Sequence, residues 1–461
     1  MNKLNKTFKM NPLYEADGYK VGHKAMLAPN TTREAWTWIP RSLKYMHPSI
    51  TKIMAAGEQL TMRYIHSTFQ EFFFDKPIDV ATSFSKDMSK YLMMDYDGEH
   101  FEELHKLGYL PVLIQSLEEG TFTNPNIPHL AGINTLDGYA WLGLFLETLV
   151  SKLSWQMPIA ATIGNKFKEN AVDWTLKTDK ENLWLTDYMC HDFHSRGGNP
   201  FSSIAVSLGH GLSQRGTDTL NAIPASRYFY DVPEDEVAFN SVNASEHSVT
   251  CTGIFYYKNK LEAGLLNNEI EKFYSFDVPC EGSVNDPDLM AIAEYLNLRD
   301  WLIKFPKGIL SYVADTFDLW KLLNYILPRL KKEILAREGK LVVRPDSGDP
   351  VDITCGKKIK DFVIEEAIAC YLDDKIRNIT PHGEYGGDIS EVVRLNGKLV
   401  EVTYNPDWNR HDKQFYYIDN WGTDVSNLTF KNLVESPADK GVVESLWDTL
   451  EVLLMNKVIR Y

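Results

Sequence analysis

A strand–helix–strand pattern between residues 308 and 348 constrains the fold more than any other feature of the sequence. GILSYVAD (308–315) is short and apolar, which is typical of a buried strand, and a long helical pattern follows in which Pro328 should kink or split the helix. KLVVRPDSG (340–348) then predicts a second strand that runs directly into turn-forming residues. A crossover of this length predicts that the two strands are parallel neighbours. The chain is therefore predicted to have an α/β fold.

Three charged residues follow these two strands: Asp315 after the first, and Arg344 and Asp346 after the second. The carboxyl ends of parallel strands meet at one edge of a sheet, so we expect the three side chains to lie close together. A guanidinium beside carboxylates suits a ligand with both phosphate and hydroxyl groups, such as a phosphorylated sugar. A surface salt bridge at a strand end is the alternative that these residues leave open.

Composition limits the classes of partner. The net charge of -15 argues against a surface for nucleic acid or anionic membranes. The N-terminus lacks the apolar core of a signal peptide, and the most apolar helix candidate, residues 139–155, is too short to span a bilayer. These features and the scattered cysteines, which lack metal-ligand spacing, predict a cytoplasmic protein that binds neither nucleic acid nor membrane. The cysteines are Cys190, Cys251, Cys280, Cys355 and Cys370.

The pattern of elements changes along the chain. Residues 1–155 alternate short strands with helices, including one helix expected over 84–107, and predict an N-terminal α/β domain. Residues 156–461 predict a second domain built from strand–helix–strand units. Within it, residues 352–435 differ in texture and predict a β-rich insertion, in which the Asn-Gly pair of RLNGKLVEV (394–402) indicates a hairpin.

Three further stretches carry residues that could take part in chemistry. HDFHSRGG contains Phe193 and Arg196, GTDT contains Asp218, and NASEHSVT contains His247. Each has an ordinary explanation when taken alone: a core aromatic residue, a helix N-cap, or a hydrogen-bonded structural histidine. The sequence has no GxxxxGK[ST], HExxH or GxSxG motif. These stretches acquire a functional meaning only together.

Their order along the chain resembles the nicotinamide phosphoribosyltransferase family, whose members have a type II phosphoribosyltransferase fold. The resemblance runs from about residue 11 to residue 350 and resumes at KGVVESLWD (440–448). It implies a (β/α) barrel-like central domain, incomplete here, beside the N-terminal α/β domain and the β-rich insertion. The motifs, in chain order, are NPLYEADGYKVGHK, HDFHSRGG, GTDT, ASEHS, VADTFD and VVRPDSGDP.

The resemblance implies a subsite for the pyridine ring. Phe193 would stack on one face of the ring, and Tyr19 from a second subunit would stack on the other. Asp218 would accept a hydrogen bond from the carboxamide NH2, and the same carboxylate would repel the carboxylate of nicotinate.

The resemblance also implies a subsite for phosphoribosyl pyrophosphate. Arg196 and Arg344 would hold phosphate oxygens. Asp315 and Asp346 would act as catalytic residues by binding ribose hydroxyls and, through the Mg²⁺ that travels with pyrophosphate, stabilising positive charge at the ribose C1. Asp17 would contribute across the interface of a homodimer with shared sites. No metal site made by protein ligands alone is expected.

His247 would be phosphorylated by ATP, an activating co-substrate that drives synthesis in its unfavourable direction. The carboxylate that orients it could be Asp315 or another acid at a strand end, and the sequence leaves this open. The implied reaction makes nicotinamide mononucleotide and pyrophosphate from nicotinamide and phosphoribosyl pyrophosphate in NAD salvage, which is a pentosyltransferase activity. Two alternatives stay open: a nicotinate phosphoribosyltransferase, against which Asp218 argues, and a non-catalytic subunit or inactive truncated remnant of the family.

The end of the chain departs from the resemblance. The family continues past Leu-Trp-Asp with x-Phe-Gly-Gly-Thr and later a glycine-rich phosphate loop, whereas this chain reads LWDTLEVLLMNKVIRY. One restored base would convert residues 450–461 into Phe-Gly-Gly-Thr-Ile-Asn-Glu-Gln-Gly-Tyr-Lys-Val under a permitted choice of codons. We therefore expect these residues to be out of frame and the C-terminal part of the family's domain to be missing.

Overall fold

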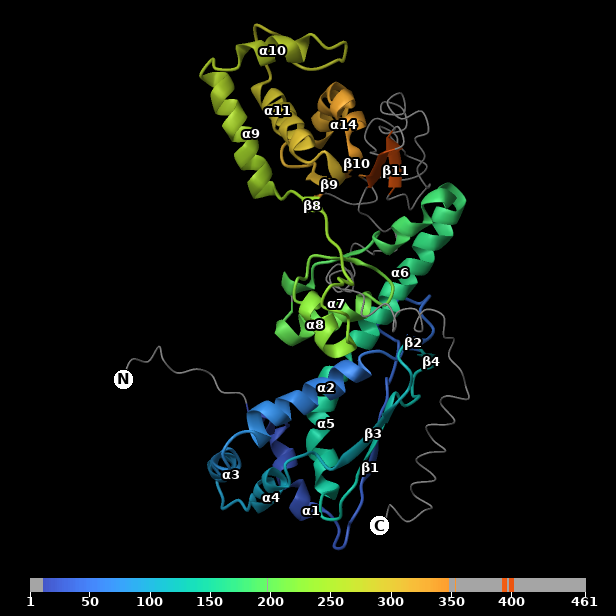
Figure 1. Ribbon diagram of the computed structural model, residues 1–461, viewed down its shortest axis with the longest axis vertical. Helices are drawn as coiled ribbons and strands as arrows, with labels where there is room; N and C mark the ends of the chain where they lie inside the picture. The colour runs from blue at the N-terminus through green and yellow to red at the C-terminus, as the bar shows by residue number, and fades with distance from the viewer. Residues whose placement is uncertain (1–10, 197, 348–352, 354–391, 396–397, 402–461) are drawn as a thin grey trace, which may run out of the picture. The chain divides into compact units, whose positions relative to one another are not determined.

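The structure is a computed structural model that describes residues 11–196, 198–347, 353, 392–395 and 398–401. These residues form two compact units (Figure 1). The first unit contains the described residues up to Phe167 together with His191–Phe239, and the second contains Lys168–Cys190 and the described residues from Asn240 onward. This division differs from the expected boundary at residue 155, because residues 191–239 fold with the N-terminal part of the chain. The assignment of two domains on either side of residue 155 stays a prediction.

The first unit is built on an antiparallel sheet with one helix packed along it (Figure 1). Two glycines leave room for the side chain of Trp36 between the sheet and the helix. A Cβ added at Gly132 would lie 2.3 Å from the indole ring, and one added at Gly143 would lie 2.6 Å from it. The indole therefore fills the space between sheet and helix, and neither glycine tolerates a side chain there. In spatial order the strands are β1 (Ala35–Trp38), β5 (Leu130–Asn134) and β3 (Val112–Ser116), and the helix is α5 (Ala140–Ser154).

The prediction of one helix over residues 84–107 is wrong. Helix α3 (Asp79–Leu92) ends where Met93 adopts a left-handed conformation with φ of 55°, and α4 (Glu99–Leu107) begins only after Gly98. Amphipathic spacing on both sides of the break made two helices resemble one. The other helices near the N-terminus are η2 (Pro12–Glu15), η3 (Gly18–Gly22), α1 (His23–Met26), α2 (Glu58–Phe69) and the π-helical turn η4 (Gln70–Phe74).

A cluster of buried hydrophobic side chains in the first unit joins its N-terminal residues to residues 191–239. Met54, Leu60 and Met157 pack with Leu208 and Phe229, and all five side chains are buried. Hydrophobic burial across this long sequence separation holds the two stretches in one unit. The remaining elements here are β2 (Ile53–Met54), β4 (Phe122–Thr123), α6 (Gln156–Thr178), β6 (His191–Asp192), η6 (His194–Arg196), α7 (Pro200–His210), β7 (Gly216–Thr217) and α8 (Ala222–Tyr230), with α6 extending into the second unit.

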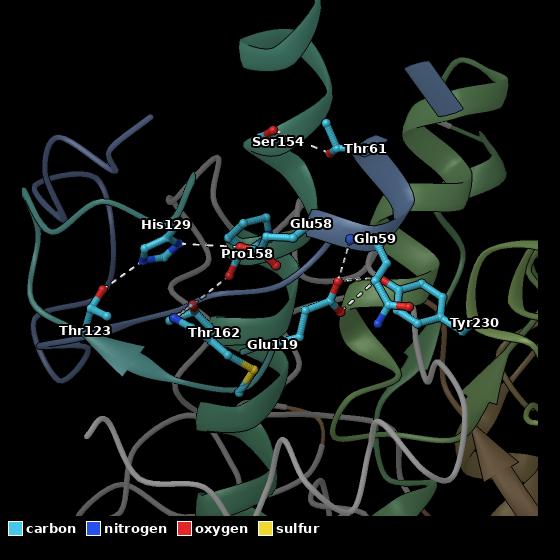
Figure 2. Close-up of polar contacts among 11 residues, drawn as sticks. Glu58, Gln59, Thr61, Glu119, Thr123, His129, Ser154, Pro158, Thr162 and Tyr230 are labelled. Atoms are coloured by element: carbon cyan, nitrogen blue, oxygen red, sulfur yellow. Dashed lines mark hydrogen bonds and ion pairs between the residues drawn. The ribbon is translucent and has the colours of Figure 1, made fainter. Parts of the chain in front are cut away.

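A buried carboxylate pair lies at the start of α2 (Figure 2). Glu119 accepts hydrogen bonds from the backbone N–H of Gln59 at 2.9 Å and from the hydroxyl of Tyr230 at 3.0 Å. Glu58 is also buried, and its Oε1 lies 3.9 Å from Nδ1 of His129. Glu119 therefore supplies a hydrogen-bond acceptor to the first turn of α2 from a distant part of the chain.

Burial controls the ionisation of this cluster. It raises the pKa of Glu58 well above its usual range, and the negative charge of Glu119 adds to the effect. Burial also raises the pKa of Glu119, and it lowers the pKa of His129 to about 4. Burial thus disfavours the charged forms of both Glu58 and His129, which argues against an ion pair between them.

The second unit contains the predicted parallel strands. β9 (Lys307–Val313) pairs in parallel with β10 (Glu338–Arg344), with Leu310 opposite Leu341, and β8 (Asn243–Ala244) pairs in parallel with the other edge of β9. The predicted strand–helix–strand unit is confirmed. Among the described residues the strands do not close into a barrel.

The crossover between β9 and β10 is broken, as Pro328 predicted. A π-helical turn precedes the proline, and Leu330 separates the two short helices that follow. A proline inside a helix removes one backbone hydrogen bond and displaces the preceding turn, which accounts for the break. The segments are α12 (Leu319–Lys321), the π-helical turn η7 (Leu322–Ile326), α13 (Leu327–Arg329) and α14 (Lys331–Ala336).

Long helices cover the sheet of the second unit, and α9 (His247–Glu262) lies against α11 (Leu289–Lys304) (Figure 1). Two buried arginines hold the backbone: Arg329 donates to the carbonyls of Phe273, Tyr325 and Val278, and Arg337 to those of Phe305, Gly308 and Lys340. Arg337 thus fixes the starts of β9 and β10. The remaining helices are η5 (Lys180–Asp187) and α10 (Asn267–Tyr274).

Only a small part of the expected insertion 352–435 is described. β11 (Val392–Leu395) and β12 (Lys398–Glu401) pair antiparallel with Leu395 opposite Lys398, which confirms the predicted hairpin. The rest of the insertion and residues 450–461, which were expected to be out of frame, lie outside the described residues. No helix in the described part of the chain has both the length and the hydropathy of a bilayer-spanning segment.

Candidate active site

His247 is the first residue of α9, directly after the turn that leaves β8. Ser245 shapes this turn: its N–H donates to the carbonyl of Ser311 at 2.9 Å, and its hydroxyl accepts a hydrogen bond from the N–H of Val313 at 2.8 Å. Both partners belong to β9, so the turn is held at the sheet edge where β9 ends. The imidazole of His247 therefore lies beside the carboxyl ends of the strands, with its side chain 47% exposed.

Two carboxylates flank the imidazole. Nε2 of His247 is 3.1 Å from Oδ1 of Asp315, and Nδ1 is 3.7 Å from Oδ2 of Asp346. The sequence left the orienting acid open, and the structure brings Asp315 into hydrogen-bond contact. Although burial raises the pKa of Asp315, hydrogen bonds from Ser347, from His247 and from the backbone of Asp346 outweigh it, and the pKa is lowered. An ionised carboxylate can only accept, so Nε2 carries a proton and donates it to Asp315; in a neutral imidazole the lone pair is then on Nδ1.

Arg344 completes this group at the end of β10. Its Nη2 donates to the carbonyl of Ser245 at 2.6 Å, and its buried Nε has no hydrogen-bond partner among the described residues. Asp346 follows with its side chain 55% exposed. The strand-end residues that the sequence predicted to meet do lie together within the second unit, next to His247.

A separate group of predicted residues lies in the first unit, on the two short strands β6 and β7. The side chain of Phe193 is 36% exposed, directly after β6. Asp218 follows β7, and its carboxylate lies 3.6 Å from Nδ1 of His191. The rings of His191 and Phe193 have centroids 6.2 Å apart. Phe193 and Asp218 are therefore neighbours by strand pairing, whereas Arg196 ends the turn η6 with an exposed side chain.

Asp192 lies at the centre of this group, and sequence reasoning missed it. Its side chain is fully buried; Oδ2 accepts hydrogen bonds from Ser207 at 2.6 Å and Thr217 at 2.8 Å, and Oδ1 accepts one from the N–H of His194 at 2.8 Å. Burial raises its pKa to about 6, although these hydrogen bonds favour the charged form. The only signal in the sequence was an acid within HDFHSRGG, and its hydroxyl partners are remote along the chain.

Asp17 and Tyr19 lie near the start of α1, against α5. Oδ2 of Asp17 accepts a hydrogen bond from the hydroxyl of Thr148 at 2.7 Å. Tyr19 is 65% exposed, and its neighbour Lys20 is buried in an ion pair with Glu147. The buried Lys20 thus anchors the segment while Asp17 and Tyr19 face outward, as residues must if a partner is to use them.

The described residues contain no group of three or more His, Cys, Asp or Glu side chains arranged to hold a metal ion. The acidic side chains beside His247 are Asp315 and Asp346, and Asp315 already binds the imidazole.

The sequence and the fold are similar to those of known phosphoribosyltransferases. Residues 188–385 match the nicotinate phosphoribosyltransferase (NAPRTase) family. The structure shares the fold of human nicotinic acid phosphoribosyltransferase, with a TM-score of 0.50 and 16% identity, over 81% of this chain and 67% of that one.

Two curated relatives are both named nicotinamide phosphoribosyltransferase. A nicotinamide phosphoribosyltransferase of Acinetobacter baylyi is 33% identical over 367 residues, 76% of this chain and 64% of the relative. One of Xanthomonas campestris is 28% identical over 249 residues, 53% of this chain and 45% of the relative. The chain thus spans about half to two thirds of the relatives it matches. The chain is therefore similar to nicotinamide phosphoribosyltransferases and, over residues 188–385, to the NAPRTase family.

Proposed function

We propose that this chain is a nicotinamide phosphoribosyltransferase, which joins nicotinamide to phosphoribosyl pyrophosphate and releases nicotinamide mononucleotide and pyrophosphate in NAD salvage. The observation that carries the proposal is His247 held between Asp315 and Asp346, with Arg344 beside them, at the ends of parallel strands. Relatives named for this activity support it.

The pyridine subsite is the Phe193–Asp218 pair. The partly exposed ring of Phe193 offers a stacking surface to a flat heterocycle, and the Asp218 carboxylate accepts a hydrogen bond from an amide NH2. A carboxylate in that position repels the carboxylate of nicotinate. This choice of residue favours nicotinamide over the alternative substrate, nicotinate.

The donor subsite is the edge of the parallel sheet. Arg344 offers its buried Nε to a phosphate oxygen, and the exposed carboxylate of Asp346 can accept hydrogen bonds from ribose hydroxyls. Arg196 is proposed as a second phosphate-binding residue.

Mg²⁺ fits this chemistry as an ion that enters with the donor. It prefers oxygen ligands and keeps one or two protein carboxylates beside phosphate oxygens, and Asp346 presents such a carboxylate. When bound, Mg²⁺ would neutralise charge on the departing pyrophosphate. Asp315 and Asp346 stabilise positive charge at the ribose C1.

ATP enters the proposal through His247. The Nδ1 lone pair attacks the γ-phosphorus of ATP, an N–P bond forms, and the bond to the ADP oxygen breaks so that ADP leaves. Asp315 keeps its hydrogen bond to Nε2–H and balances the positive charge of the phosphorylated ring.

We also propose an isologous homodimer in the cytoplasm. Asp17 and Tyr19 are exposed on an anchored segment, which suits a contribution to the site of a second copy. Among the described cysteines, Cys251 and Cys280 are free thiols, which suits a reducing compartment.

The purified chain should make nicotinamide mononucleotide from nicotinamide and phosphoribosyl pyrophosphate when Mg²⁺ is present, and ATP should raise the rate. Mass spectrometry of the product gives the readout. His247→Ala is the control: it should abolish the ATP stimulation and leave some ATP-independent turnover. Donor binding without product would support a non-catalytic family member instead, and a preference for nicotinate would support the other alternative.

A further inference from the structure

The two residues proposed to bind nicotinamide are held in place by few backbone hydrogen bonds. Phe193 follows β6 and Asp218 follows β7, and each of these strands contains only two residues. One additional backbone contact, from the N–H of Asp218 to the carbonyl of Asp192 at 2.9 Å, extends the pairing. Two-residue strands have little stability of their own, so other interactions must fix the relative position of the two loops.

The side chain of Asp192 provides these interactions. Its carboxylate binds the hydroxyl of Thr217 on β7, the hydroxyl of Ser207 on α7 and the N–H of His194 in the turn after Phe193. One buried acid therefore connects both loops to a helix of the same unit. Because Asp192 is buried, the loss of one of these hydrogen bonds is costly: the hydroxyl or N–H that loses its partner is left unsatisfied.

We propose that Asp192 is a positioning residue for nicotinamide: through its hydrogen bonds to Thr217, Ser207 and His194 it sets the stacking ring of Phe193 and the amide-reading carboxylate of Asp218 at the spacing that one pyridine carboxamide requires. The inference rests on the proposed function, because it assigns a cause to the geometry of that pyridine subsite.

Thr217→Val tests the inference with little change in shape, because valine keeps the branched side chain and lacks only the hydroxyl. We expect the KM and the Kd for nicotinamide to rise about tenfold, because the variant loses the hydrogen bond to Asp192 and the one that the Thr217 hydroxyl accepts from the N–H of Thr219. The kcat and the KM for phosphoribosyl pyrophosphate should change less than about twofold. Thr217→Ser restores the hydroxyl and should return the nicotinamide affinity to near the wild-type value.

Ser207→Ala removes the second hydroxyl from a different element and gives an independent test if Thr217→Val fails to fold. Asp192→Asn should weaken nicotinamide binding more than either, because it replaces the shared acceptor. Thermal melting followed by circular dichroism reports on folding, and ATP-dependent phosphorylation of His247 reports on the second unit. For Thr217→Val, both should stay near the wild-type values.

The inference is overturned if Thr217→Val and Ser207→Ala bind nicotinamide as the wild type does, or if Thr217→Ser is as weak as Thr217→Val. It is supported if only the hydroxyl-deleting variants lose affinity for nicotinamide. A wild-type chain that does not bind nicotinamide, measured by titration calorimetry, overturns the proposed function and this inference together.

Discussion

An ionised carboxylate accepts but cannot donate a hydrogen bond, and at the residue scale this would determine which nitrogen of His247 reacts in the proposed phosphorylation. Asp315 holds Nε2–H at 3.1 Å, so the nucleophilic lone pair is on Nδ1. We expect the phosphorylated chain to carry phosphate on Nδ1, as identified by chromatography of the base-hydrolysed protein against the two phosphohistidine isomers. Asp315→Asn should slow phosphorylation about tenfold or more, since the asparagine no longer balances the charge on the ring.

Asp346→Asn is the matched control, because Asp346 lies 3.7 Å from the other ring nitrogen and is more exposed. It should weaken donor binding and affect phosphorylation less than Asp315→Asn does. Phosphate on Nε2, or equal losses in the two variants, would contradict the orienting role of Asp315.

A second prediction at the residue scale concerns the choice of substrate. Asp218→Asn removes the charge that repels a carboxylate and keeps the size of the side chain. The preference for nicotinamide over nicotinate should fall about 10- to 100-fold, as measured by competition between the two substrates. An unchanged preference would show that another group reads the amide.

The sequence predicted which site residues lie together where the strand topology alone determines their positions. Asp315, Arg344 and Asp346 follow parallel strands, so their meeting could be foreseen from the strand–helix–strand pattern. Asp192 could not be foreseen, because neither its burial nor its contacts with Ser207 and Thr217 leave a periodic signal in the sequence.

At the scale of elements, the start of helix α2 contains a group whose charge state should control stability. Because the pKa of Glu58 is raised in the folded chain, the stability that its protonated form contributes is fully present below the ordinary carboxyl pKa and declines as the pH rises above it. The lowered pKa of His129 acts oppositely, but only below about pH 6.5. We therefore expect the free energy of unfolding of the first unit to fall as the pH rises above about 6.5.

Glu58→Gln keeps the shape without an ionisable group, so it should flatten this pH dependence and stabilise the chain at pH 8 by on the order of 1 kcal/mol. Urea unfolding at a series of pH values gives the measurement. Glu118→Gln, at an exposed carboxyl beside Glu119, should leave the profile unchanged. A Glu58→Gln profile parallel to that of the wild type would contradict the protonated state of Glu58.

Helices, strands and breaks could be predicted where a few adjacent residues determine them. The Asn-Gly hairpin and the break at Pro328 depend on a few adjacent residues, and both were found. The break between α3 and α4 was missed because Met93, in a left-handed conformation, is not a residue that usually marks a helix end.

At the scale of the whole molecule, shared sites predict complementation between two inactive variants. In the proposed homodimer, Tyr19→Ala would damage the site of the partner copy, and Phe193→Ala would damage the site of its own copy. A random mixture of the two contains heterodimers with one intact site, so activity should recover to about a quarter of the wild-type value. Each variant alone is the control, and a mixture no more active than the mean of its parents would contradict shared sites. Light scattering should show a dimer.

The order of synthesis has a consequence for the first unit. Its core joins Met54, Leu60 and Met157 to Leu208 and Phe229, so the unit cannot close until His191–Phe239 has left the ribosome. Lys168–Cys190, made in between, must wait longer still for partners that begin at Asn240. At roughly 5–20 residues per second, the nascent chain spends several seconds with apolar surface uncovered, which is the interval in which chaperones act.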